Sequence, residues 1–268
     1  FSAELGGKNA MIVTRGADLD KVAKAATRAC FSNAGQLCIS IERIYVESDV
    51  ADEFTRKFGE ATRAMKLGTG YDFSADMGSL ISEGQLKTVS NHVDDAKAKG
   101  ATVIAGGKAR PDIGPLFYEP TVLTGVTAEM ECAANETFGP LVSIYPVADV
   151  EEAIARANDT EYGLNASVWA ASTGEGEKIA ARLRSGTVNV NEGYAFAWGS
   201  LSAPMGGMGT SGVGRRHGAE GLLKYTEAQT IATARVLNLD PPFGMPPTLW
   251  QKSLLPMVQA VMRLPGRK

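Results

Sequence analysis

The sequence has few of the residues that build disulfide or metal frameworks. It holds three cysteines and two histidines among 268 residues. An odd number of cysteines without regular spacing argues against a disulfide scaffold. Cys30, Cys38 and Cys132, taken with His92 and His217, also lack the spacing of a zinc site. We therefore expect a cytoplasmic protein, kept in a reducing compartment, with no metal centre.

Long apolar runs and a strong excess of one charge are also missing. No stretch of about 18 consecutive apolar residues occurs, so we expect no membrane span. The formal net charge of -3 gives no electrostatic case for a nucleic-acid partner. The first residue is Phe1 rather than Met, and we therefore expect a fragment of a longer chain. The composition, 44% hydrophobic and 21% charged, is otherwise that of an ordinary globular protein.

Segments with helical periodicity alternate with β-branched, strand-like segments along the chain. The expected helices are 18–32, 48–65, 82–99, 150–158 and 174–184, and the expected strands are 39–46, 101–105, 141–147, 166–170 and 187–191. This alternation predicts an α/β fold with a mainly parallel sheet flanked by helices. The strand at 101–105 is expected to be buried.

Two long irregular stretches interrupt the alternation, and the composition changes near the end of the chain. Residues 106–119 are predicted to be a surface excursion, whereas 192–214 are too long for an ordinary connection and are a candidate site loop. We expect one domain over 1–235. Residues 236–268 are predicted to be a proline-rich linker followed by a tail helix, 248–264, bent or interrupted at Pro256.

Cys38 is the cysteine with the most suggestive surroundings. It follows Asn33-Ala34-Gly35-Gln36-Leu37, where a predicted helix gives way to a strand. A partly exposed thiol at such a junction can act as a nucleophile, although a small buried hydrophobe is the alternative. Cys30 lies on the apolar face of a predicted helix and, like Cys132, is expected to be structural.

Two carboxylates precede glycine-containing turns. Glu4 comes before Leu5-Gly6-Gly7-Lys8, and a carboxylate beside such a turn can be a general base or simply a solvated side chain. Glu136 begins Glu136-Thr137-Phe138-Gly139-Pro140, which could hold a ribose hydroxyl and a flat ring, or be an ordinary turn. The residues alone leave both alternatives open.

A glycine run near the end of the site loop imitates a dinucleotide fingerprint. Gly207-Met208-Gly209-Thr210-Ser211-Gly212 fits the pattern G-x-G-x-x-G, and Glu227 follows at about the expected distance. The fingerprint needs a strand directly before its first glycine, and residues 193–206 are loop-like. We therefore predict that this run is not a cofactor-binding turn.

Taken together, these segments resemble the aldehyde dehydrogenase superfamily, and within it the succinate-semialdehyde dehydrogenases of actinobacteria. The resemblance extends from residue 4 to about residue 235. The matching motifs are Glu4-Leu5-Gly6-Gly7-Lys8, Asn33-x-Gly35-Gln36-x-Cys38, Glu136-x-Phe138-Gly139-Pro140, Gly186-Thr187-Val188-Asn189-Val190-Asn191 and Pro204-x-Gly206-Gly207-x-x-x-Ser211-Gly212-x-Gly214-Arg215. The resemblance implies the family's catalytic domain, without its N-terminal Rossmann domain.

The resemblance also implies a role for each motif. Cys38 matches the nucleophile that forms a thiohemiacetal and then a thioester, and Glu4 matches the base that activates water. Glu136 matches the ligand of the nicotinamide ribose, Phe138 matches the aromatic residue beside the nicotinamide, and Gly6 belongs to a turn near that ring. The implied cofactor is NAD or NADP, bound mostly by the missing half. The implied assembly is a homo-oligomer, a dimer or a tetramer, that acts on a small-molecule aldehyde.

The substrate and two rival functions remain open at this stage. Family members that use succinic semialdehyde commonly carry an arginine where this chain has Ser32, which would leave the distal carboxylate without its usual partner. Tyr194, Phe196 and Trp198 could line an aromatic channel or pack their loop down. The rivals are a non-redox cysteine hydrolase or acyltransferase, and an inactive interaction domain derived from a dehydrogenase.

Overall fold

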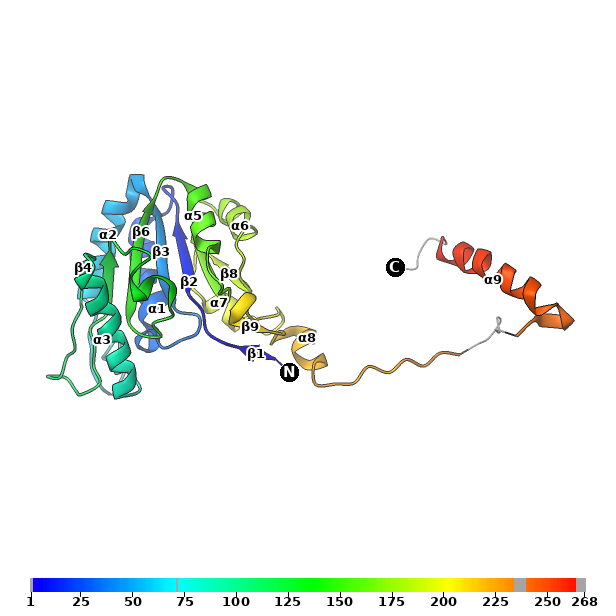
Figure 1. Ribbon diagram of the computed structural model, residues 1–268. Helices are drawn as coiled ribbons and strands as arrows, with labels where there is room; N and C mark the ends of the chain where they lie inside the picture. Colours follow the sequence, from blue (N-terminus) through cyan, green and yellow to red (C-terminus); the bar gives the residue numbers. More distant parts are fainter. Residues whose placement is uncertain (1, 71, 234–239, 264–268) are drawn as a thin grey trace. The chain divides into compact units, whose positions relative to one another are not determined.

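The protein is described here by a computed structural model that covers residues 2–70, 72–233 and 240–263, without the side chains of 243 and 261. It divides into two units, Phe1–Tyr225 and Thr226–Lys268 (Figure 1). The first unit contains every motif named above. It ends before residue 235, where the composition placed the boundary, and the second unit is described separately below.

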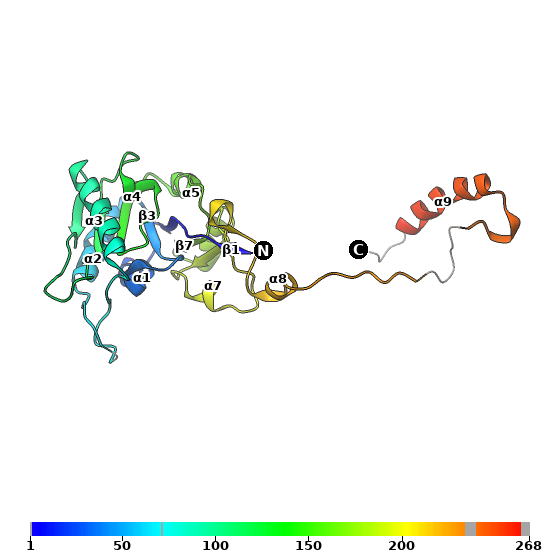
Figure 2. The same cartoon turned by 60° about the horizontal axis from the view of Figure 1, so that its bottom comes forward.

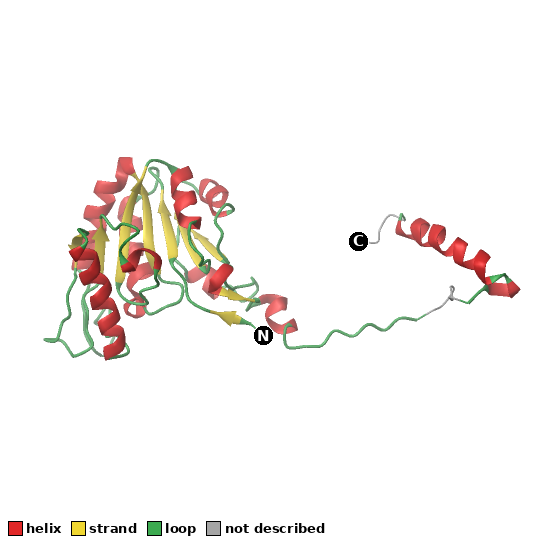
Figure 3. Ribbon diagram, viewed as in Figure 1, coloured by secondary structure: helices red, strands yellow, loops and turns green. Residues whose placement is uncertain are grey.

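A seven-stranded sheet with the strand order β4-β5-β6-β3-β2-β7-β8 forms the centre of the first unit (Figure 3). Its strands are β2 (Asn9–Val13), β3 (Ile41–Glu47), β4 (Thr102–Ala105), β5 (Thr121–Thr124), β6 (Leu141–Val147), β7 (Asn165–Trp169) and β8 (Thr187–Val190). All neighbouring pairs are parallel except β4 with β5. The predicted α/β fold with a mainly parallel sheet is therefore confirmed.

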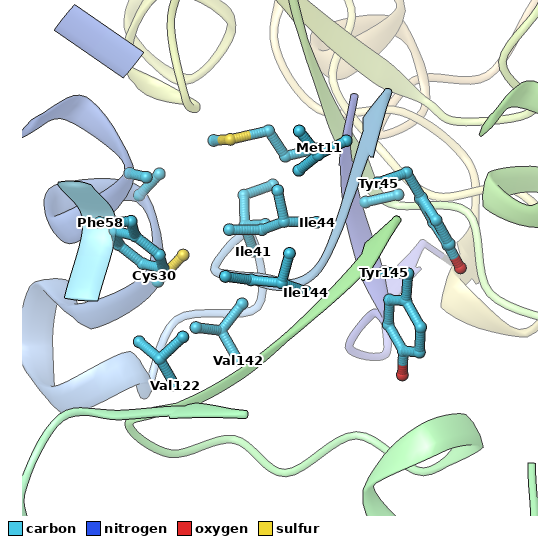
Figure 4. Close-up of a cluster of buried hydrophobic side chains, with 14 of the residues drawn as sticks. Met11, Cys30, Ile41, Ile44, Tyr45, Phe58, Val122, Val142, Ile144 and Tyr145 are labelled. Atoms are coloured by element: carbon cyan, nitrogen blue, oxygen red, sulfur yellow. The ribbon is translucent and has the colours of Figure 1, made fainter. Parts of the chain in front are cut away.

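The chain winds outward from the middle of the sheet in both directions, so helices cover both faces (Figure 2). α1 (Leu19–Phe31) and α2 (Ser48–Arg63) share one face, where Phe31 and Phe58 stack with their ring centres 6.0 Å apart. α5 (Val150–Asn158) lies on the other face, where its Arg156 guanidinium is 5.3 Å from the ring centre of Tyr45 and 5.1 Å from that of Tyr145. Figure 4 shows Phe58 and the two tyrosines on opposite sides of the strands.

Most expected helices begin and end close to the predicted residues. α5 and β6 have the predicted bounds, and the side chain of Asp18 caps α1 by accepting a hydrogen bond from Lys21 N at 3.2 Å. The others are α3 (Glu83–Ala98), which Ser82 caps, and α6 (Thr173–Ala180). The unpredicted helices are α4 (Glu131–Ala134), α7 (Ala195–Gly199) and α8 (Gly218–Leu223).

The account of the seven-stranded sheet needs three corrections. β2 and β5 were not predicted, although β2 is buried along its whole length in the middle of the sheet. The strand near 101–105 was predicted to be buried, but β4 is an antiparallel edge strand whose Thr102 is exposed. An edge strand has a neighbour on only one side, which leaves part of it in solvent.

The second unit contains α9 (Pro247–Met262), with Pro256 inside the helix as predicted. A short 3-10 turn, Pro242–Gly244, precedes it. The predicted helix end at 264 lies outside the described residues. None of the helices in the described parts of the chain is long and apolar enough to cross a lipid bilayer.

Candidate active site

The motif residues meet at the edge of the sheet where its parallel strands begin. Glu4 comes before β2, Cys38 before β3 and Glu136 before β6. Because these strands are parallel and adjacent, their preceding loops meet at one edge. The sequence thus brings three distant segments together through the register of β2, β3 and β6.

Two asparagines at the start of their strands hold the loop that carries Cys38. Asn9 Nδ2 donates to the carbonyl oxygens of Cys38 at 2.8 Å and Ser40 at 2.7 Å. Asn165 N donates to Asn9 Oδ1 at 3.0 Å, and Asn165 Nδ2 donates to Ile39 O at 3.0 Å. Asn9 and Asn165 are buried, so these bonds fix the backbone of Cys38 and of the two residues that follow it. The sequence analysis did not identify either asparagine.

Cys38 is half-buried, whereas Cys30 and Cys132 are buried. Its side chain packs, with those of Leu37 and Tyr194, against a small apolar cluster of Ile39, Leu164 and Met205. Burial raises the pKa of the Cys38 thiol, and the negative charges of Glu4 and Glu136 raise it further, while Arg216 acts in the opposite direction. Both carboxylates and one arginine therefore lie within electrostatic reach of the thiol.

Glu4 is held by a small second sheet. β1 (Ala3–Glu4) pairs in antiparallel register with β9 (Gly212–Val213), with Glu4 opposite Gly212. Glu4 Oε2 forms an ion pair with Arg216 Nη1 at 3.1 Å. Glu4 Oε1 is buried and has no hydrogen-bond partner among the described residues. Arg216 thus holds one carboxylate oxygen of Glu4, and the other is left unpaired among the described residues.

Glu136 lies against the Gly6-Gly7 turn. Its Oε1 accepts a hydrogen bond from Gly7 N at 2.9 Å. Gly6 has a φ of +88°, and a Cβ there would lie 2.4 Å from Glu136 Oε2, so only glycine leaves room for this carboxylate. Burial raises the pKa of Glu136. The turn and the carboxylate therefore form one unit beside Cys38.

A buried ion pair supports the segment that follows Glu136. Lys8 and Glu42 are both buried and paired with each other. Glu42 Oε1 accepts hydrogen bonds from Thr137 N and Phe138 N, each at 3.0 Å. Phe138 has a φ of 49° and its side chain is partly exposed at the surface. The sequence analysis missed Glu42, although a carboxylate inside an apolar strand was a visible signal.

The glycine run 207–212 lets two segments of the chain pack closely together. Residues Gly209–Ser211 form a 3-10 turn that leads into β9, so no helix begins at Gly212. A Cβ at Gly212 would lie 2.1 Å from Ala3 O, which explains why this position is glycine. The run thus allows β9 to approach β1 closely.

The predicted substrate residues do not form one group in the structure. Ser32 lines a surface pocket with Lys24, Arg28 and Asp76, and Cys38 is not among the residues that line it. Tyr194 packs beside Cys38, as described above. Phe196 and Trp198 are 76% and 60% exposed on α7, so neither packs its loop down.

The described residues give no support to a zinc centre or to a Cys–His hydrolase. No group of three or more possible metal ligands occurs among them. His92 Nδ1 lies 3.1 Å from Thr137 Oγ1, and the groups whose charges act on Cys38 are carboxylates and an arginine. Among the described residues, no hydrogen bond joins His92 or His217 to Cys38, so no Cys–His pair of the kind that such a hydrolase needs is formed.

The half-buried cysteine and the two carboxylates lie within a segment that matches a known protein family. The family described as "Aldehyde dehydrogenase family" matches residues 1–231. The chain therefore belongs to the aldehyde dehydrogenase family, as the motifs indicated.

Relatives are similar over part of their own length. A Mycobacterium ulcerans protein named "Putative succinate-semialdehyde dehydrogenase (NADP+) 2" is 88% identical over 268 residues, which are 100% of this chain and 52% of that protein. A Mycolicibacterium smegmatis protein with a corresponding name is 78% identical over 267 residues, again 52% of its length. The chain thus spans about half the length of these relatives.

Solved structures agree with the fold. The betaine aldehyde dehydrogenase of Staphylococcus aureus in complex with NAD+ matches with a TM-score of 0.79 and 36% identity, over 84% of this chain and 44% of that one. An aldehyde dehydrogenase variant from Bacillus cereus has the same score and identity. The sheet described above is therefore an aldehyde dehydrogenase fold.

Proposed function

We propose that this chain is the catalytic part of an NAD(P)-dependent aldehyde dehydrogenase, which oxidises an aldehyde to the carboxylic acid. The observation that supports this most is the position of Cys38, half-buried within reach of the charges of Glu4 and Glu136. A nucleophile with a candidate general base nearby is what acyl chemistry needs.

In the proposed reaction, the Cys38 thiolate attacks the aldehyde carbon to form a carbon–sulfur bond. Loss of a hydride from the resulting thiohemiacetal leaves a thioester on Cys38. Glu4 then takes a proton from water, and the resulting hydroxide attacks the thioester. The carbon–sulfur bond breaks, which releases the acid and restores the thiolate, and the proton on Glu4 passes to solvent. The free, buried Glu4 Oε1 suits this step because no described group competes for its lone pairs.

The cofactor's reactive end would be held partly by this chain. When bound, NAD(P)+ supplies the acceptor for the hydride. Glu136 fits a ribose ligand, since one of its oxygens is fixed by Gly7 N and Gly6 leaves space for the carboxylate. The relatives' names specify NADP+ and the solved neighbour holds NAD+, so we propose that one of these two is used.

We propose an acid semialdehyde as the first substrate to test, because the relatives are named for succinic semialdehyde. Ser32 is not expected to bind its carboxylate, since it lines a pocket that excludes Cys38. We also propose that the complete enzyme is a cytoplasmic homo-oligomer.

The test uses a chimera in which this chain replaces the matching segment of the Mycobacterium ulcerans relative, called here the reconstituted enzyme. Its turnover is measured with succinic semialdehyde and with butanal, each with NAD+ and NADP+. Reduction of either cofactor that disappears in Cys38→Ala and persists in Cys132→Ala supports the proposal. Undiminished turnover in Cys38→Ala contradicts it.

A further inference from the structure

Resting on the proposed role of Glu4, we propose that Arg216 is a positioning residue of the active site. Its guanidinium holds one oxygen of Glu4, so that the other oxygen stays directed toward the reacting group on Cys38. Arg216 acts through Glu4 and not as a proton donor or acceptor of its own.

The backbone at Arg216 is fixed relative to both catalytic segments. Arg216 N and O exchange hydrogen bonds with Met205 O and N at 2.6 and 2.7 Å. The Met205 side chain belongs to the apolar cluster on which Cys38 packs. β9, a few residues earlier, pairs with β1 and so with Glu4. Arg216 is therefore tied to Cys38 through Met205 and to Glu4 through the β1–β9 pair.

The side chains make the link directly. Arg216 Nη1 lies 3.1 Å from Glu4 Oε2, in a bond between residues 212 positions apart in the chain. The Glu4 side chain is only 12% exposed, so little solvent is available to its carboxylate in place of Arg216. Glu4 Oε1 has no partner among the described residues. Arg216 is the group that fixes which oxygen is left free.

The charge of Arg216 also serves the thiol. Glu4 and Glu136 both disfavour a thiolate at Cys38, whereas Arg216 favours it. A base placed beside a nucleophile normally makes that nucleophile harder to ionise, and the arginine offsets this effect. Arg216 thus reduces the extent to which Glu4 disfavours the thiolate form of Cys38.

Burst kinetics of the reconstituted enzyme separate this role from the role of Glu4. The burst reports hydride transfer, and the later steady rate reports thioester hydrolysis. We expect Arg216→Gln to keep the amplitude of the burst, to slow the burst only as far as the smaller thiolate fraction of Cys38 requires, and to lower the steady rate about tenfold or more, because the base is misplaced. Arg216→Lys should recover part of the loss. Arg56→Gln, which removes an exposed arginine from its ion pair with Glu60, is the matched control and should behave like the parent.

The double variant Arg216→Gln/Glu4→Gln distinguishes a failure of this inference from a failure of the proposed base role of Glu4. If Arg216 acts through Glu4, the steady rate of the double variant should be no lower than that of Glu4→Gln alone. Two results overturn the inference while leaving the base role of Glu4 intact. The first is a parental steady rate in Arg216→Gln, and the second is that Arg216→Gln lowers the steady rate by the same factor in the parent and in Glu4→Gln. A parental steady rate in Glu4→Gln overturns the base role and this inference with it.

Thiol alkylation in this chain gives an independent readout. Iodoacetamide labelling of Cys38 is followed across pH by peptide mass spectrometry. The midpoint of this labelling should shift to higher pH in Arg216→Gln, since a positive charge beside the thiol is lost. An unchanged or lowered midpoint contradicts the assigned charge effect. Thermal melting of each variant verifies that it is folded.

Discussion

Gly35 lies directly against the carbonyl oxygen of Gly139. A Cβ at position 35 would be 2.1 Å from Gly139 O and 3.0 Å from Pro140 N, and Gly35 has a φ of +70°. This contact joins the turn that carries Cys38 to the turn that carries Glu136 and Phe138. The two motifs are therefore one structural unit, although about a hundred residues separate them.

We predict that Gly35→Ala destabilises the chain by about 2 to 4 kcal/mol, because a methyl group meets backbone on the other side and the backbone conformation favours glycine. Urea unfolding measures this loss. The matched control is Gly174→Ala, in α6, where no atom lies within 4 Å of the added Cβ. It should be neutral or stabilising by up to about 1 kcal/mol. Equal stability of the two variants would refute the backbone contact.

The surroundings of Cys38 predict a thiol that ionises late. Because burial, Glu4 and Glu136 raise its pKa, alkylation of Cys38 should have a midpoint above that of an ordinary cysteine. Glu4→Gln removes a negative charge, so the midpoint should fall. Alkylation across pH, read at the Cys38 peptide, provides the measurement, and a midpoint that rises in Glu4→Gln is incompatible with the structure.

The buried Lys8–Glu42 pair predicts a strong dependence of stability on both charges. Glu42→Gln leaves the Lys8 ammonium without its anionic partner and weakens the bonds to Thr137 N and Phe138 N. We expect a loss of about 3 to 5 kcal/mol. Glu60→Gln, which breaks the exposed Arg56–Glu60 pair, should cost no more than about 1 kcal/mol in the same urea titration. Similar losses would show that Glu42 is not buried with Lys8.

The sequence patterns predicted the layers of the fold better than its centre. Amphipathic helices such as α5 have a clear period, and β6 is long and bounded by turns. β2 is buried throughout, so it shows no alternation of apolar and polar residues. Periodicity cannot identify such strands.

Some residues of the site could be found from the sequence, and others could not. Cys38, Glu4 and Glu136 stand in motifs that the family resemblance makes visible. Asn9 and Glu42 act through partners far along the chain, Asn165 for Asn9 and Thr137 for Glu42, so the sequence around each residue does not show what it binds. Arg216 likewise reaches Glu4 only because β9 pairs with β1. These relationships depend on the tertiary structure.

This chain alone should bind NAD+ or NADP+ only weakly. Glu136 and Phe138 can contact the nicotinamide end, whereas much of a dinucleotide's affinity comes from a pyrophosphate at a helix N-terminus. The glycine run at 207–212 does not provide one, because no helix begins at Gly212. Calorimetry with each cofactor tests this, and micromolar binding by a monodisperse sample would contradict it.

The most direct test of the proposed chemistry is the mass of Cys38 during turnover. The Glu4→Gln variant of the reconstituted enzyme is mixed with succinic semialdehyde and NADP+, or with NAD+ if that is the cofactor used, then quenched in acid and digested. Slow hydrolysis should leave the acyl group of the substrate as a thioester on the Cys38 peptide, and hydroxylamine should remove it. Cofactor reduction without any acyl adduct on Cys38, or an adduct on Cys30 or Cys132 instead, would contradict the mechanism.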